Sequence, residues 1–106
     1  GIDPERVVLD PGIGFGKTRE HNLKLVASLD RLVATVHAVL LGTSRKRFMG
    51  SICANSDGSA PQRTELLGAT CATTALGVAL GVKIFRVHDV KANRQAADVA
   101  HAIMRA

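Results

Sequence analysis

The chain has no tryptophan, no tyrosine, three phenylalanines and two cysteines among its 106 residues. Proteins that read nucleic acid commonly stack bases on exposed aromatic side chains, so this shortage disfavours nucleic-acid binding. Cys53 and Cys71 are too few and too far apart for a metal site. They fit free thiols in a reducing compartment better than a disulfide.

Long apolar runs are also missing. The stretch from Val33 to Leu41 is interrupted by Thr35 and His37, and no run reaches the roughly 18 residues of a membrane span. No secretion signal is recognisable. We therefore expect no membrane partner and a cytoplasmic location, or an organelle lumen if a transit segment precedes Gly1. Hydrophobic and charged contents of 46% and 22% are those of one globular unit.

Acidic residues are in the minority, with 9 Asp and Glu against 14 Lys and Arg and a net charge of +5. This balance favours anionic partners. The basic residues are scattered, with small groups at 45–47 and around Arg86, and do not form one basic face. A small anionic ligand is therefore favoured over nucleic acid.

Short apolar stretches alternate with amphipathic ones along the chain. Strands are predicted over 6–10, 36–41 and 82–88, and helices over about 19–31, about 63–80 and 93–105. Thr18 is a predicted N-cap, and Gly81 is predicted to end the second helix. The middle strand is apolar throughout, which predicts cover on both faces. Residues 55–62 are predicted to form an exposed polar loop.

Each predicted helix has a face that should pack. The first carries an apolar stripe that should face the sheet, and the second carries small residues that should allow close packing. The third repeats its apolar residues on one side. These three sets are Leu23, Val26, Leu29 and Val33; Gly68, Ala72, Ala75 and Ala79; and Ala96, Val99 and Ile103.

Polar residues gather at the C-terminal ends of all three predicted strands. In parallel βα units, ligands bind at this carboxyl edge of the sheet. A complete (β/α)8 barrel takes about 250 residues, so the chain is either a small three-stranded layered protein or the last part of a barrel. Three parallel strands leave two open edges, which favours the partial barrel.

A glycine-rich loop, DPGIGFGKT from Asp10 to Thr18, joins the first strand to the first helix. A Walker phosphate loop would need glycine where Pro11 stands, and the dinucleotide fingerprint would need glycine where Lys17 stands. Neither nucleotide motif is present, and a turn without a ligand is the simplest alternative. The polar groups at 44–46 and 86–88, at equivalent strand ends, favour a binding site.

Three motifs occur in order: DPGIGFGKT followed by His21 and Asn22, GTSRKRFMG over 42–50, and RVHDV over 86–90. Together they resemble the C-terminal part of dihydropteroate synthases, from about Val7 to the last helix. The resemblance implies an α/β fold: the sixth to eighth βα units of a (β/α)8 TIM barrel, with parallel strands and covering helices. Residues 1–106 would then form a partial pterin-binding TIM-barrel domain.

The resemblance also implies an activity, that of a transferase of folate biosynthesis. Members of this family join 6-hydroxymethyl-7,8-dihydropterin pyrophosphate to p-aminobenzoate, which gives 7,8-dihydropteroate and pyrophosphate. Magnesium binds the pyrophosphate in these metal-binding enzymes, and the family often forms dimers, so a homodimer is expected.

Five residues are implied to contact the pterin substrate. Asp10 would accept paired N–H bonds from the aminopyrimidine ring, and Lys46 would bond the ring where the backbone of Gly42 passes close. Arg86 would lie against the pterin and help to hold the pyrophosphate, and His88 would bind the anion. The simpler alternatives are a loop-capping role for Asp10, a solvated Lys46, and a histidine bonded to backbone at position 88.

Phe15, Lys17 and Ser44 are implied on the p-aminobenzoate side, although Phe15 equally fits ordinary core packing. Arg45 at the same corner ranks below Lys46. The catalytic residues implied are Lys46, Arg86 and His88, because cations can stabilise the charge on the departing pyrophosphate.

The family's remaining ligands, including its metal-binding asparagine, have no counterpart in this chain. We therefore expect the magnesium ligand outside it and the isolated chain to be inactive. Glu65 also stands where the family has an arginine, three residues before Gly68, with Arg63 two positions away. This exchange would alter how the loop after the second strand is anchored.

Two other functions remain open. One is a non-catalytic module that binds a pterin or an anion. The other is a related pterin-dependent methyltransferase with a corrinoid partner, which is disfavoured because such an enzyme has no pyrophosphate to hold.

Overall fold

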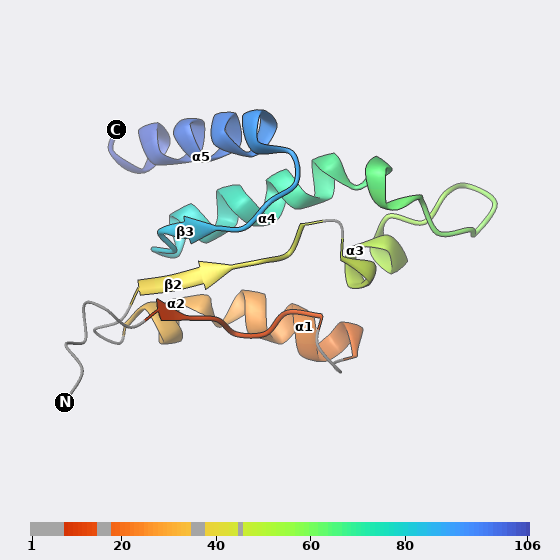
Figure 1. Ribbon diagram of the computed structural model, residues 1–106, viewed down its shortest axis with the longest axis horizontal. Helices are drawn as coiled ribbons and strands as arrows, with labels where there is room; N and C mark the ends of the chain where they lie inside the picture. Colours follow the sequence, from red (N-terminus) through yellow and green to blue (C-terminus); the bar gives the residue numbers. More distant parts are fainter. Residues whose placement is uncertain (1–7, 15–17, 35–37, 45) are drawn as a thin grey trace.

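The computed structural model describes residues 8–14, 18–34, 38–44 and 46–106. The strands in these ranges are β1 (Val8–Leu9), β2 (Ala38–Leu41) and β3 (Ile84–Phe85). The helices are α1 (Arg19–Ala27), α2 (Leu29–Val33), α3 (Arg47–Ile52), the short 3-10 helix η2 (Arg63–Glu65), α4 (Leu67–Ala79) and α5 (Val90–Met104) (Figure 1).

The strands form a parallel sheet in the order β1-β2-β3. Val8 pairs with Ala38 between β1 and β2, and Leu41 pairs with Phe85 between β2 and β3. The expected α/β class with parallel strands is confirmed. Within the described residues, β2 runs to Leu41 as predicted, β1 ends before Asp10, and β3 contains only two of the residues predicted over 82–88. The predicted residues 6, 7, 36 and 37 lie outside the described ranges.

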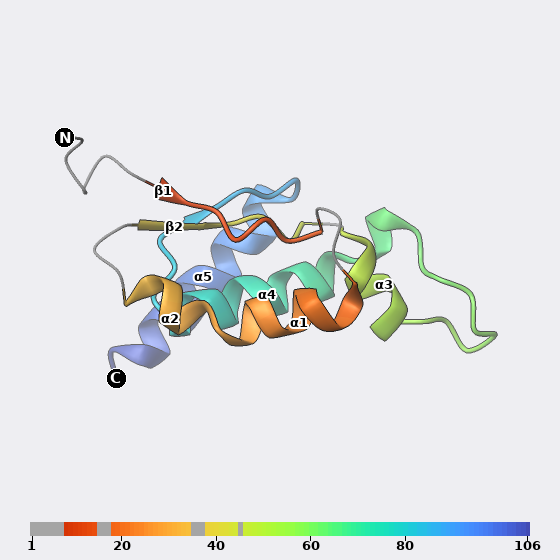
Figure 2. The same ribbon diagram turned by 90° about the horizontal axis from the view of Figure 1, so that it is seen from below.

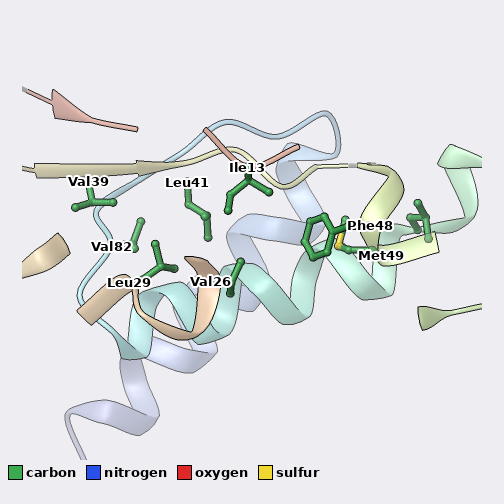
Figure 3. Packing of buried hydrophobic residues seen from close by; sticks show 9 residues of the cluster. Ile13, Val26, Leu29, Val39, Leu41, Phe48, Met49 and Val82 are labelled. Carbon is green, nitrogen blue, oxygen red and sulfur yellow. The ribbon is translucent and has the colours of Figure 1, made fainter. Parts of the chain in front are cut away.

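The helices cover one face of the sheet. Figure 2 shows the strands as one layer and α1, α2 and α4 as a second layer against one of its faces. Helix α5 packs on α4. The core between the layers includes Val39 and Leu41 of β2 together with Leu29 of α2 (Figure 3). The alternate residues Ala38 and Leu40 are only half-buried. In the described part of the chain, the prediction of cover on both faces is therefore wrong.

The helix predicted over 19–31 is two helices with a break at Ser28. Thr18 caps α1 as predicted, because its hydroxyl accepts a hydrogen bond from the backbone N–H of His21 at 3.2 Å. The expected stripe is only partly correct. Leu29 is buried, whereas Leu23 is 39% exposed.

The helix predicted over 63–80 is likewise divided, into η2 and α4. The side chain of Glu65 accepts a hydrogen bond from the backbone N–H of Gln62 at 2.8 Å and completes a capping box at the start of η2. In this chain, Glu65 therefore serves a local cap. Gly81, with φ of 96°, ends α4 as predicted.

The face of α4 that packs on the sheet differs from the one predicted. Its buried residues are Thr70, Thr74 and Gly77, whereas Gly68, Ala72 and Ala79 are exposed. The prediction rested on residue size alone. In the structure, Gly77 is the glycine of α4 that lies against side chains of the sheet. Two threonines occupy the other buried positions, and the hydroxyl of Thr74 donates to the side-chain oxygen of Asn93 on α5 at 2.6 Å.

Helix α3 was not predicted, and α5 begins at Val90 rather than at 93. Phe48 and Met49 of α3 are buried in the core. On α5, Val99 and Ile103 are 59% and 68% exposed, so the apolar side noted in the sequence faces away from the core. The polar loop is exposed over 55–60, as predicted. In the part of the chain that the structure describes, no helix is long and apolar enough to cross a membrane.

Candidate functional site

The carboxyl ends of the three strands bring charged side chains together from distant parts of the sequence. The backbone N–H of Arg86, just after β3, donates to the carbonyl oxygen of Leu41 at 3.0 Å. The Arg86 guanidinium lies against the backbone of Gly42, where an added Cβ would be 2.8 Å from Nη2. Glycine at position 42 therefore makes room for the arginine, and these two predicted site residues are adjacent.

Lys46, after β2, reaches across to the loop that follows β1. Its ammonium donates a hydrogen bond to the carbonyl oxygen of Ile13. Its aliphatic stem lies over Gly14, where an added Cβ would be 3.0 Å from Cδ of the lysine. Lys46 is half-buried, so the alternative of a fully solvated charge is wrong.

Burial lowers the pKa of Lys46 below its ordinary value of 10.5, and the positive charge of Arg86 lowers it further. The Asp10 carboxylate partly opposes this shift. Lys46 is thus influenced by the charges of two other predicted site residues, each from a different strand end. This arrangement of one acid and two cations can bind a ligand with both N–H donors and anionic oxygens.

Asp10 is exposed and lies directly after β1. One of its carboxylate oxygens accepts a hydrogen bond from the backbone N–H of Gly12 at 2.8 Å. Gly12 has φ of 72°, a conformation that costs glycine little. The loop-capping role considered as an alternative is therefore present. This hydrogen bond occupies one of the two carboxylate oxygens and restricts the orientation of the carboxylate.

Ser44 and His88 meet across the ends of β2 and β3. The Ser44 hydroxyl oxygen lies 2.7 Å from Nδ1 of His88 and also accepts the backbone N–H of His88 at 3.0 Å. Among the described residues, the partner found for the ring is a side chain rather than the backbone of the simpler alternative. Phe15, Lys17 and Arg45 lie outside the described residues.

Asn22 has a role at this edge that the sequence did not assign, although it follows the glycine motif. It is 2% exposed on α1, and its side-chain oxygen accepts the backbone N–H of Gly14 at 2.8 Å. Gly14 has φ of 85°. The buried amide of Asn22 therefore holds the loop after β1, to which Lys46 also donates a hydrogen bond. The available signal was its polar side chain at a position that should be buried.

Within the described ranges, no group of three or more His, Cys, Asp or Glu side chains gathers in a way that could hold a metal ion. The carboxylates are dispersed, and the charges near Asp10 are cationic. The described residues of this chain therefore do not fit a magnesium site, and we derive no step through one.

A model of the family described as "Pterin binding enzyme" matches residues 1–88, and the chain belongs to this family. Its curated relatives include dihydropteroate synthases, as the motifs indicated. The one from Mycobacterium leprae is 43% identical over 100% of this chain and 37% of its own length. The one from Staphylococcus epidermidis is 50% identical over 92% of this chain and 34% of its own length.

Solved structures give the same result. The dihydropteroate synthase of Clostridium difficile, solved in the presence of pteroic acid, is 42% identical with a TM-score of 0.89, over 100% of this chain and 38% of its own. The enzyme of Thermus thermophilus in complex with 6HMPPP is 43% identical with a TM-score of 0.81, over 92% and 37%. A third structure shows the Thermus enzyme with 4-aminobenzoate. The chain thus spans well under half the length of these relatives.

Proposed function

We propose that this chain is the C-terminal part of a dihydropteroate synthase and supplies the sixth to eighth βα units of its (β/α)8 barrel. Residues 1–106 would form a partial pterin-binding domain of a cytoplasmic transferase. The complete enzyme joins 6-hydroxymethyl-7,8-dihydropterin pyrophosphate to p-aminobenzoate and releases pyrophosphate. The observation that carries the proposal is the meeting of Asp10, Lys46 and Arg86 at one edge of the sheet in a member of this family.

These residues suit the two ends of the pterin substrate. Asp10 has one oxygen bonded to Gly12, and its other oxygen can accept N–H groups from an aminopyrimidine ring. Arg86 presents a planar guanidinium, which can lie against a ring and also hold phosphate oxygens. The Lys46 stem lies against Gly14, and its ammonium is influenced by both the Asp10 carboxylate and the Arg86 guanidinium.

The chemistry expected of these residues is stabilisation of the leaving group. As the bond from the pterin methylene to pyrophosphate loosens, negative charge grows on the departing oxygens, and Arg86, His88 and Lys46 stabilise it. The amine of p-aminobenzoate then attacks the methylene, so no protein nucleophile is required. We place p-aminobenzoate near Ser44, Phe15 and Lys17. We expect magnesium to be bound by residues outside this chain and to neutralise charge on the pyrophosphate.

The isolated chain should not catalyse. The helix layer covers only one face of the described sheet, and the outer edges of β1 and β3 have no described neighbour. In the proposal, five further βα units close the barrel and bring the other ligands. They would also leave a surface through which two copies can form a homodimer.

A chimera tests this proposal directly. Residues 1–106 would replace the matching segment of the Staphylococcus epidermidis enzyme, and dihydropteroate formation would be measured from both substrates. We expect activity from the chimera and none from the 106-residue chain alone. A folded but inactive chimera would refute the proposed function, and activity of the chain alone would refute the claim that it is incomplete.

A binding titration separates the enzyme from a module that merely binds pterins. Asp10→Asn in the chimera should weaken binding of a pterin pyrophosphate analogue about tenfold or more, the loss of a charge-assisted hydrogen bond. Asp30→Asn is the matched control, because Asp30 is exposed on α2, away from the strand ends. If the two variants bind the analogue with equal affinity, Asp10 does not contact the pterin. Binding without turnover would favour the non-catalytic module.

A further inference from the structure

Ser44 contacts His88 through two hydrogen bonds that share one hydroxyl oxygen. The Ser44 side chain belongs to a residue that is only 7% exposed. Its hydroxyl oxygen accepts the backbone N–H of His88 at 3.0 Å and lies 2.7 Å from Nδ1 of the same residue. One hydroxyl therefore fixes both the backbone and the ring of His88. This bond joins the segments that follow β2 and β3.

Both segments are tied to α4 immediately beside this contact. Thr43, before Ser44, has its hydroxyl 2.5 Å from the hydroxyl of Thr73. On the other side, the side chain of Asn93 donates to the carbonyl oxygen of Asp89 at 2.9 Å and accepts from Thr74 at 2.6 Å. The serine and the histidine therefore approach each other from two anchored positions, which favours a single ring orientation.

The donor and acceptor capacities of the two side chains favour one arrangement of the protons at this contact. A serine hydroxyl has one hydrogen to donate and two lone pairs to accept with. One lone pair takes the backbone N–H of His88. Within the described residues, the hydrogen-bond partner left for the hydroxyl hydrogen is Nδ1 of the His88 ring. A neutral ring that accepts at Nδ1 carries its own hydrogen on Nε2.

We propose that Ser44 is a positioning residue that holds neutral His88 in the tautomer with hydrogen on Nε2. His88 is exposed, and this tautomer offers an N–H donor to an anionic oxygen without the ring first taking up a proton. The inference rests on the proposed function insofar as the anion is the pyrophosphate of the pterin substrate. It gives the Ser44 hydroxyl a role on the pyrophosphate side, in addition to the p-aminobenzoate side proposed for that residue.

The tautomer is measured on the 106-residue chain itself by nitrogen-15 NMR of the histidine rings, at a pH near 8, where an ordinary imidazole is neutral. His88→Asn identifies the signals. We expect an unprotonated Nδ1 and a protonated Nε2 at His88. Ser44→Ala should move both shifts towards a mixture of tautomers, and Ser44→Thr, which keeps a hydroxyl, should restore the wild-type pattern. His101, exposed on α5, is the internal reference.

A protonated Nδ1 in the wild-type chain would overturn the inference, and this measurement needs no Ser44 variant, only His88→Asn for the assignment. So would unchanged His88 shifts in Ser44→Ala. In the active chimera, Ser44→Ala should lower kcat/KM for the pterin pyrophosphate about tenfold, the loss of one hydrogen bond. A rise confined to KM for p-aminobenzoate would instead assign the hydroxyl to that substrate alone. Because the NMR experiment contains no substrate, its failure leaves the proposed function standing, and an inactive chimera leaves the tautomer standing.

Discussion

Gly77 of α4 lies directly against side chains of the sheet, and Gly77→Ala should destabilise the chain. An added Cβ would be 2.8 Å from Cε1 and 3.1 Å from Cζ of Phe85 on β3, and 3.2 Å from Cδ2 of Leu41 on β2. These are atoms of packed core side chains, with little freedom to retreat. The helix must therefore move away from the sheet, or the Phe85 ring must leave its preferred rotamer.

Two opposing effects set the magnitude. Forcing an extra methyl group into a packed core costs about 1–3 kcal/mol. Alanine in place of glycine in a helix interior gains about 1 kcal/mol. The expected net change for Gly77→Ala is a loss of about 1 kcal/mol. Gly68→Ala is the matched control in the same helix, because nothing lies within 4 Å of its added Cβ. That variant should gain up to about 1 kcal/mol.

The assay is urea unfolding of the three chains, followed by far-ultraviolet circular dichroism, with the free energies compared only where the m-values agree. The difference between the two variants removes the propensity gain and leaves the cost of overpacking, about 1–3 kcal/mol. If Gly77→Ala proves as stable as Gly68→Ala, the close contact between α4 and the sheet is wrong. The placement of Leu41 and Phe85 beneath the helix would then need revision.

Three further predictions concern the site. Gly42→Ala places a Cβ 2.8 Å from Nη2 of Arg86, so in the chimera it should weaken binding of the pterin pyrophosphate about tenfold with little loss of stability; unchanged affinity would place the guanidinium elsewhere. Asn22→Ala leaves the N–H of Gly14 without its partner and should cost about 1–3 kcal/mol in urea unfolding; a smaller loss would indicate that water replaces the amide. The lowered pKa of Lys46 means that the unfolded chain holds this proton more tightly, so stability relative to Lys46→Met should rise as pH increases from the lowered pKa to 10.5; a difference independent of pH across unfolding curves would contradict the shift.

The positions of the site residues could be predicted from the sequence because each stands at the end of an apolar stretch. Asp10, Lys46 and Arg86 follow three such stretches, and parallel βα units place these ends at one edge. The contact between Ser44 and His88 could not be predicted in this way. It depends on the register of β2 against β3 and on the anchoring of both segments to α4, and these are tertiary features.

The lengths of elements were less predictable, for physical reasons. In the described sheet, β2 pairs on both sides and has four residues, whereas β3 pairs only with β2 and has two. Apolar residues flank β3, but no second described strand pairs with it. Helix α3 has six residues, too few for a helical period to be recognised. Glu65 completes the turn at which the next predicted helix divides.

The one-sided helix layer has a genetic consequence. One face of the described sheet and the outer edges of β1 and β3 have no described neighbour. The contacts that would complete the proposed barrel there are noncovalent, so they do not require a peptide bond to the preceding units. A polypeptide that supplies those units need not be encoded in the same reading frame. A strain that lacks dihydropteroate synthase and expresses the two parts from separate genes would reveal this by growing without added folate.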